Sequence, residues 1–350
     1  MIAIPSFSNI ALNWFEENRR KLPWRSEADP YKIWVSEIIL QQTRVNQGWN
    51  YYLRFVERFP DVKTLAEAPL LEVLHVWQGL GYYSRARNMH IAAQEIMQKH
   101  RGIFPHHYSE ILKLKGIGNY TAAAVASIAF QLPYPAVDGN VLRVITRIFG
   151  IYDDIALPET VHVIRQLCGK LMDKENPGSF NQALMELGAI QCTPKNPKCE
   201  ICPFVSHCVA YAKEQVDILP FKSLKIKIKE RYLHYFIFLK DHKTIIEQRT
   251  GNDIWKNLFQ FPLIETFNPC EAVQEDLIAE AGFGNCKPVF LKELKQKLTH
   301  QHLTVRFYIC SDYLPDLKNH WNMVAVEKLA EYPFPVVLQF PVSSPHHLII

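Results

Sequence analysis

The stretch Leu114-Lys-Gly-Ile-Gly-Asn-Tyr-Thr-Ala-Ala-Ala124 decides the fold of the first part of the chain. Two glycines two positions apart, Gly116 and Gly118, allow a tight turn, and the small residues after them predict a helix. Ser109 is expected to cap a short helix before the turn. Backbone N–H groups of the turn and of the following helix N-terminus can hold a phosphate without reading a base. An ordinary turn between two helices would have the same sequence, so its meaning depends on the motifs around it.

Helical patterns surround this turn. Asp29-Pro30 is a capped helix start, followed by an amphipathic run to Thr43. No convincing alternation of apolar and polar residues interrupts residues 7–212, so we expect an all-α domain over residues 1–212. Its further helices are expected at about 49–59, 70–78, 84–99, 109–114, 120–130, 139–149, 158–173 and 180–190.

The composition changes after Tyr211. Residues 213–230 alternate lysines with apolar residues and are expected to form an exposed linker that leads into a strand. Beyond it the hydrophobic period becomes two, and one helix is expected at about 270–281. The second domain, residues 231–350, is therefore predicted to be α+β. Its strands are expected at 232–239, 243–247, 289–291 and 299–310.

Composition and charge narrow the class of protein. The 350 residues are 48% hydrophobic, which excludes intrinsic disorder, and 39 basic against 35 acidic residues give a net charge of +4. Such a balance argues against a bulk polyelectrolyte binder, so any contact with DNA must be local. With no membrane-spanning run and no signal sequence in view, we expect a protein of the cytoplasm, nucleoid or nucleus that is not secreted and has no membrane partner. We also expect a monomer.

Four of the eight cysteines lie within 17 residues, with the spacing C-x6-C-x2-C-x5-C. Four thiolates in one short loop can ligate a 4Fe–4S cluster. A structural zinc is the alternative, but zinc sites more often have two close pairs separated by a long insert. We therefore expect a 4Fe–4S cluster, and the other cysteines, Cys168, Cys270, Cys286 and Cys310, are isolated. The cluster ligands would be Cys192, Cys199, Cys202 and Cys208.

Two carboxylates have the setting of catalytic groups. Glu37 has Ile33, Trp34 and Leu40 as helix neighbours, so desolvation would raise its pKa and suit it to a general acid. A solvated or ion-paired glutamate is an equal alternative from this helix alone. Asp138 precedes a helix, where an aspartate is most often an N-cap.

Together these motifs resemble one family. The turn, the two carboxylates and the cysteine loop have the order found in helix-hairpin-helix DNA glycosylases, and within them in adenine DNA glycosylases of the MutY type. The resemblance covers essentially the whole chain. It also rests on Leu22-Pro-Trp-Arg25, Ser36-Glu-Ile-Ile-Leu-Gln-Gln-Thr43, Gly79-Leu-Gly-Tyr-Tyr-Ser-Arg-Ala-Arg-Asn88, Val137-Asp-Gly-Asn140 and Asn181-Gln-Ala-Leu-Met-Glu-Leu-Gly188.

The resemblance implies an enzyme that flips adenine, mispaired with 8-oxoguanine or guanine, out of double-stranded DNA and hydrolyses its glycosidic bond. Glu37 would protonate the adenine, and Asp138 would stabilise the oxocarbenium-like sugar. Tyr120 and Asn140 would support them beside the sugar. Substrate contacts are implied for Arg25, Leu40, Gln42, Thr43, Tyr82 and Gln182, and phosphate contacts for Gly116, Gly118, Arg85 and Arg87.

One position separates related enzymes. Endonuclease III-type relatives place a Schiff-base lysine two residues after the second glycine of the turn, where this chain has Tyr120. Without that amine, strand cleavage has no nucleophile, so a monofunctional glycosylase is expected. The alternatives are a thymine-mismatch or endonuclease III-like glycosylase, and a DNA-binding protein that uses the fold without catalysis.

The second domain resembles the Nudix-like domain of these glycosylases, through Ile246-Glu-Gln-Arg249 and Ile254-Trp-Lys-Asn-Leu-Phe-Gln-Phe-Pro262. The acidic Nudix box is absent, so the domain should recognise 8-oxoguanine and not hydrolyse a nucleotide. Where the family has a Phe-Ser-His turn, this chain has Leu298-Thr299-His300. Thr299 keeps the hydroxyl, and Thr299 and His300 would contact the 8-oxoguanine. Leu303, Val305 and Phe307 should share the buried face of the following strand.

Overall fold

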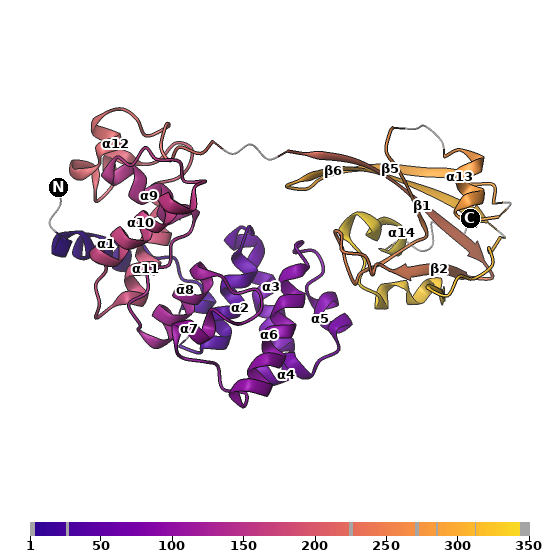
Figure 1. The fold of residues 1–350 in the computed structure, drawn as a ribbon, viewed down its shortest axis with the longest axis horizontal. Coiled ribbons are helices and arrows are strands. Elements are labelled where there is room, and N and C mark those ends of the chain that lie inside the picture. Colours follow the sequence, from indigo (N-terminus) through magenta and orange to yellow (C-terminus); the bar gives the residue numbers. More distant parts are fainter. Residues whose placement is uncertain are drawn as a thin grey trace. The chain divides into compact units, whose positions relative to one another are not determined.

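The computed structural model describes residues 4–25, 28–223, 227–269, 273–284, 286–311 and 313–343. The chain forms two compact units, described separately below (Figure 1). The first comprises Met1–Glu67 and Asn88–Leu224, and the second comprises Ala68–Arg87 and Lys225–Ile350. The sequence placed Ala68–Arg87 in the helical domain, whereas its contacts group it with the second unit. Within the described residues, no helix has the length and apolar character needed to cross a membrane.

The first unit is helical, as predicted. Helix α2 begins at Pro30, and the side chain of Asp29 caps it by accepting a hydrogen bond from the N–H of Tyr31 (2.9 Å). Beyond the helices expected from the sequence, the unit has α1 and the short α4 and α12. Its elements are α1 (Ile4–Asn18), η1 (Pro23–Arg25), α2 (Pro30–Leu40), α3 (Val45–Arg58), α4 (Val62–Glu67), α6 (Ser84–His100, shared with the second unit), α7 (Tyr108–Ile111), α8 (Asn119–Phe130), α9 (Gly139–Phe149), α10 (Pro158–Leu171), α11 (Pro177–Glu186), η2 (Leu187–Gln191), η3 (Cys199–Ile201), η4 (Val205–His207) and α12 (Val209–Ala212).

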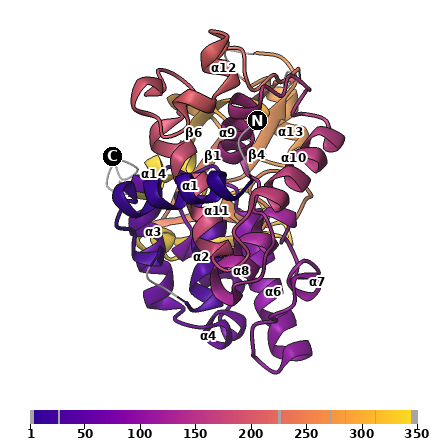
Figure 2. The same cartoon turned by 90° about the vertical axis from the view of Figure 1, so that its left-hand side faces the viewer.

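Helix α8, directly after the glycine turn, lies in the middle of this unit. Its residues Thr121–Ser127 are buried, and most of them are alanines, so α2 and α11 can both pack against it (Figure 2). Gly116 has φ +79°, and a Cβ there would come within 2.6 Å of the Cβ of Asn88, so this turn requires glycine. The prediction for Ser109 was wrong. Ser109 lies inside α7, whose N-cap is His107.

A second core joins α1, α9, α10 and α11. The rings of Phe7 and Phe204 lie 4.7 Å apart, and Phe180 contacts Phe7 from α11 at 6.3 Å. Phe204 belongs to the cysteine loop and is fully buried. The loop is therefore attached to the helical core by an aromatic side chain of its own.

Part of the predicted linker packs on the first unit. The N–H of Ile155 donates to the carbonyl of Phe221 (3.0 Å), and Leu219 is buried. Residues 224–226 lie outside the described residues, and strand β1 starts at Lys229.

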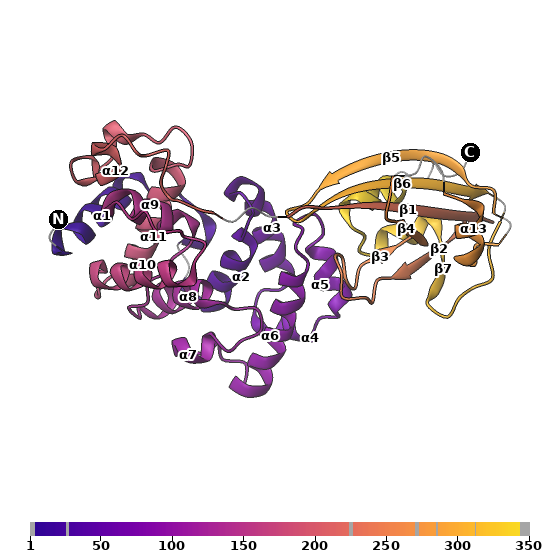
Figure 3. The same ribbon diagram turned by 45° about the horizontal axis from the view of Figure 1, so that its top comes forward.

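The second unit is built on a mixed seven-stranded sheet, which confirms the α+β prediction. Its order is β3-β2-β1-β6-β5, with β4 paired to β1 and β7 paired to β2. Strands β1 and β6 run parallel over 11 residue pairs, with β5 on the other side of β6 (Figure 3). The elements are α5 (Leu70–Val76), β1 (Lys229–Lys240), β2 (Lys243–Gln248), β3 (Phe259–Gln260), β4 (Leu263–Thr266), α13 (Glu275–Glu280), β5 (Val289–Lys297), β6 (Gln301–Ser311), β7 (Trp321–Ala325), η5 (Val326–Glu331), η6 (Val336–Leu338) and α14 (Gln339–Ser343).

Both faces of the sheet are covered. Leu303, Val305 and Phe307 of β6 face a core shared with η5 and η6, as their alternation predicts. Phe236 and Tyr308 contribute to a second core, with α13. The helix expected at 270–281 is α13, and residues 270–272 lie outside the described part.

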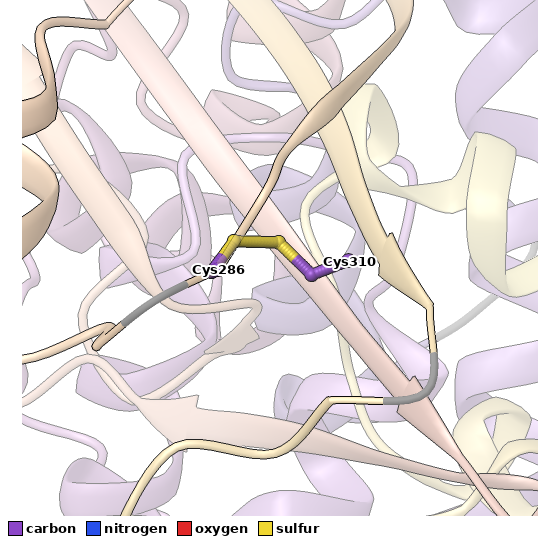
Figure 4. The surroundings of a disulfide bond; sticks show 2 residues. All are labelled: Cys286 and Cys310. Carbon is purple, nitrogen blue, oxygen red and sulfur yellow. A yellow bond between two sulfur atoms is a disulfide. The ribbon is translucent and has the colours of Figure 1, made fainter.

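Two cysteines outside the cluster form a disulfide. Cys286, just before β5, and Cys310, on β6, are joined with an Sγ–Sγ distance of 2.05 Å (Figure 4). Cys168 stays a buried thiol, and burial raises its pKa to about 12. Cys270 lies outside the described residues.

Candidate functional site

Glu37 and Tyr120 meet between two helices of the first unit. Glu37 lies on α2, and Tyr120 is the second residue of α8, directly after the glycine turn. The hydroxyl of Tyr120 donates to Oε2 of Glu37 (2.6 Å) and also contacts Sδ of Met185 on α11 (3.1 Å). Glu37 keeps some exposed surface, although protein surrounds its carboxylate.

The surroundings of Glu37 favour its protonated form. Burial raises the pKa of Glu37 to about 7 and outweighs the hydrogen bond from Tyr120, which opposes the rise. The negative charge of Asp138 adds to the increase, whereas the positive charge of Arg25 opposes it. Tyr120 itself has its pKa raised well above its usual value, mainly by burial and then by the charges of Glu37 and Asp138. Glu37 can therefore hold a proton near neutral pH while Tyr120 keeps its own.

Asp138 caps helix α9 and faces the same site. Its Oδ1 accepts from the N–H of Val141 and its Oδ2 from the side-chain amide of Asn140, each at 2.8 Å. Burial raises the pKa of Asp138, and these hydrogen bonds oppose the rise. The N-cap geometry predicted from the sequence is confirmed, and it presents the carboxylate beside Glu37 and Tyr120, since its charge acts on both.

Asn140 is itself held from behind by Arg143. The Nη2 atom of Arg143 donates to Oδ1 of Asn140 (2.9 Å) and to the carbonyl of Gly188 (2.7 Å), while Nε donates to the carbonyl of Cys192 (2.7 Å). Gly188 is close enough to Asn140 that a Cβ would come within 2.6 Å of its Cβ. One hydrogen-bonded path therefore runs from Asp138 to the start of the cysteine loop.

Arg25 is fixed by a carboxylate that the sequence analysis did not single out. Glu186, the last residue of α11, accepts from both terminal nitrogens of Arg25 (2.6 and 3.0 Å) and also binds Arg20. Burial alone would raise the pKa of Glu186, but the hydrogen bonds from the two arginines lower it to about 2. A glutamate in an otherwise apolar run, one turn after Gln182, was the signal that could have identified it.

The remaining substrate positions of the first unit lie on or next to the same helices. Gln182 lies on α11 and is half-buried, and Leu40 ends α2. Gln42 is exposed and has φ +61°, a left-handed conformation that is unusual for this residue type, and Thr43 follows it. Both turn glycines, Gly116 and Gly118, are exposed.

In the second unit, the hydroxyls of Tyr82 and Thr299 are hydrogen-bonded to each other. Thr299 and His300 are exposed in the turn between β5 and β6, and Tyr82 is 43% exposed. Asp253–Trp255 and Gly79–Ser84 line a cavity with this turn. The roles of these side chains toward DNA stay predictions.

The two arginines predicted to bind phosphate make internal contacts. Arg85 donates to the carbonyls of Leu80 and Gly81 and stacks on Trp77, and burial lowers its pKa to about 10. Arg87 donates to the carbonyl of Lys256 (2.8 Å). Because these groups are occupied in shaping the second unit, phosphate binding by Arg85 and Arg87 stays a prediction.

The four clustered cysteines line one apolar cavity, next to Val144 and Leu187. None of them forms a disulfide. Burial, followed by the charges of the neighbouring thiols, raises the pKa of Cys199, and burial raises that of Cys202 to about 11 and that of Cys208. Arg147 donates to Sγ of Cys192 (3.4 Å), so a buried cation is present to offset thiolate charge. The donor set therefore fits an anionic metal–sulfur group.

Three parts of the chain match known protein families. Residues 35–173 match the family of HhH-GPD superfamily base excision DNA repair proteins. Residues 192–208, which hold the four cysteines, match the iron–sulfur binding domain of endonuclease III, and residues 234–339 match the NUDIX domain.

Whole proteins show the same likeness. An adenine DNA glycosylase of Buchnera aphidicola subsp. Schizaphis graminum is 38% identical over 261 residues, 74% of this chain and 75% of that protein. A second, of Buchnera aphidicola subsp. Baizongia pistaciae, is 38% identical over 309 residues, 85% and 84% of the two chains. The solved structure of a thermostable thymine-DNA glycosylase superposes with a TM-score of 0.56 at 30% identity, over 60% of this chain and 97% of that one. The chain therefore belongs to the adenine DNA glycosylase family, with an iron–sulfur binding loop between its helix-hairpin-helix and NUDIX parts.

Proposed function

We propose that this chain removes adenine paired with 8-oxoguanine or guanine from duplex DNA, and that it hydrolyses the N-glycosidic bond without cutting the strand. The observation that carries the proposal is the site formed by Glu37, Tyr120 and Asp138. Glu37 accepts from the Tyr120 hydroxyl, and Asp138, bound to Val141 and Asn140, acts on both by its charge; two carboxylates in different environments are what acid-assisted glycosidic cleavage needs.

The first step is protonation of the base. The glycosidic bond is not accessible inside the base stack, so the adenosine must leave the duplex and enter the pocket. With a pKa of about 7, Glu37 is protonated in about half of the molecules at neutral pH, so it can donate its proton to a ring nitrogen of adenine. The protonated adenine then leaves as a neutral molecule.

Asp138 acts on the sugar that remains. Departure of the base leaves positive charge on the sugar ring, which a carboxylate stabilises by its charge or by a transient bond. Two hydrogen bonds, from the N–H of Val141 and from Asn140, hold the carboxylate of Asp138 in place before the substrate arrives. Little reorganisation is then required in the transition state.

Tyr120 supports the absence of strand cleavage. Cleavage through a Schiff base requires a nucleophilic amine next to the sugar carbon, and Tyr120 offers a hydroxyl. Its raised pKa and its hydrogen bond to Glu37 keep the hydroxyl protonated and oriented. The abasic product should therefore remain an intact strand.

Two further parts of the chain assist the reaction. The exposed hydroxyl of Thr299, its neighbour His300 and the Tyr82 ring would contact the base opposite the adenine. Cys192, Cys199, Cys202 and Cys208 would hold a 4Fe–4S cluster. The cluster would supply a cross-link between the loop and the helices behind the site.

A panel of labelled duplexes tests the proposal. Adenine opposite 8-oxoguanine, adenine opposite guanine, thymine opposite guanine and an undamaged duplex are each incubated with excess protein and analysed with and without alkali. We expect cleavage after alkali only, and only for the two adenine mispairs. Excision of thymine in preference to adenine, or direct nicking at the rate of base loss, would contradict it.

A further inference from the structure

Glu186 is the most heavily hydrogen-bonded carboxylate near the site. Its side chain is 1% exposed and accepts five hydrogen bonds. Three come from Arg20, through its backbone N–H, Nε and Nη2, and two come from Arg25. Both oxygens of the carboxylate are therefore fully used, and neither is left to contact a substrate.

Arg25 is held by Glu186 in one orientation. Its two terminal nitrogens bind the two oxygens of Glu186 as a fork, and Nη1 also donates to the carbonyl of Arg20 (3.0 Å). The guanidinium lies over the ring of Phe15, 5.4 Å from its centroid. With 15% of its side chain exposed, Arg25 has little freedom to turn elsewhere.

Within the part of the chain that the structure describes, the charged and titratable groups named as acting on Glu37 come from three elements. They are Tyr120 on α8, Asp138 at the start of α9, and Arg25 on η1. Tyr120 donates to Glu37, and Asp138 is bound to Val141 and Asn140. Arg25 is the cation among them, and its hydrogen bonds go to Glu186 and Arg20. The positive charge of Arg25 already acts on Glu37 from the position in which Glu186 holds it.

We propose that Glu186 is a positioning residue, which holds the guanidinium of Arg25 and so prevents Arg25 from forming a salt bridge with Glu37. This inference rests on the proposed function, because it matters only if Glu37 must be protonated to act. A carboxylate that pairs with an arginine loses its proton more readily. Glu186 thus keeps the guanidinium of Arg25 bound to itself and leaves the acid without a cation as its partner.

The test is the pH dependence of single-turnover excision of adenine opposite 8-oxoguanine, for the wild type, Glu186→Gln and Glu186→Asp. Gln cannot balance the charge of Arg25, so the alkaline limb of the profile should move down by about 1 pH unit or more. At pH 8 the rate should fall by about 10-fold relative to the wild type, and by far less at pH 5.5. Asp keeps the charge and should keep the wild-type limb.

A double variant and a second single variant make the test specific. The double variant that combines Glu186→Gln with Arg25→Gln releases no cation, so the alkaline limb of its pH profile should not move to lower pH. If Glu186→Gln does not fold by circular dichroism, Arg25→Lys gives the same test, because a lysine lacks the fork that binds both oxygens. In Arg25→Lys the alkaline limb of the pH profile should also move to lower pH.

The outcomes separate the two proposals. No excision by the wild type would overturn the proposed function. A wild-type limb near pH 7 that stays in place in Glu186→Gln, or in Arg25→Lys, would overturn the role of Glu186 alone. An equal loss of rate at every pH would likewise reduce Glu186 to a residue that only stabilises the fold.

Discussion

Replacing Tyr120 by Phe tests how the acid is tuned. The 2.6 Å hydrogen bond from the Tyr120 hydroxyl stabilises the ionised form of Glu37 and keeps its pKa from rising further. A hydrogen bond to a charged group is worth about 1.5–3 kcal/mol, and about 1.4 kcal/mol corresponds to one pKa unit. Removing it should raise the pKa of Glu37 from about 7 by about 1–2 units.

The assay is the single-turnover rate of adenine excision between pH 5 and pH 9. With an acid of pKa about 7, the wild-type rate at pH 8 should be about one tenth of that at pH 6. In Tyr120→Phe this ratio should rise to about 0.5 or more, even though the rates themselves fall if the hydroxyl also contacts the sugar. The result is read from the pH at which the excision rate falls, and not from the rate itself.

Tyr108→Phe is the matched control. It removes a phenolic hydroxyl that is bound to Asn119 (3.1 Å) and has no contact with Glu37. Its limb should coincide with that of the wild type. A Tyr120→Phe limb that stays at pH 7 or moves to lower pH would refute the view that this hydroxyl stabilises ionised Glu37.

Three more predictions concern the surroundings of the site. Arg143→Met should lower both the rate of excision and the iron bound per chain, because it leaves the carbonyls of Cys192 and Gly188 without their donor. The bound iron is measured by absorbance and by an iron assay. Lys170→Met, on the exposed surface, is the control and should change neither quantity. Thr299→Ala should reduce the preference for 8-oxoguanine over guanine opposite adenine, and an equal loss on both duplexes would refute that role. Because the folded-state pKa of Glu186 is lowered to about 2 from 4.5, its contribution to stability should be complete above about pH 4.5 and disappear as the pH falls toward 2. The melting temperature should fall less steeply in Glu186→Gln than in the wild type over this range.

The sequence predicted the features that depend on residues within a single helix or strand. Asp138 precedes a helix and caps it, and the neighbours of Glu37 on α2 are apolar, so an N-cap and a raised pKa could both be expected. The alternation of apolar and polar residues along β6 likewise predicted which face of that strand is buried. In each case the signal lies within one element, either at the start of a helix or at the period of a helix or strand.

The other contacts of the site join residues far apart in the sequence and depend on tertiary packing. Tyr120 meets Glu37 across 83 residues, and Arg25 meets Glu186 across 161, so neither pair has a signal in the local pattern. Glu186 on a helix is ordinarily expected to be solvated, and its burial depends on two arginines that arrive from elsewhere. The strands β3 and β4 were missed because they span only two and four residues, and β7 was missed because its buried residues do not alternate.

The most direct test of the central claim compares Asp138→Asn with the wild type on one duplex that carries adenine opposite 8-oxoguanine. Binding is followed by fluorescence anisotropy, and excision by alkali cleavage under single-turnover conditions. Asn can keep the cap of α9 but cannot stabilise a positive sugar, so we expect binding within a few-fold of the wild type and excision at least about 100-fold slower. Excision at the wild-type rate would contradict the account, because Asp138 would then be a helix cap and nothing more.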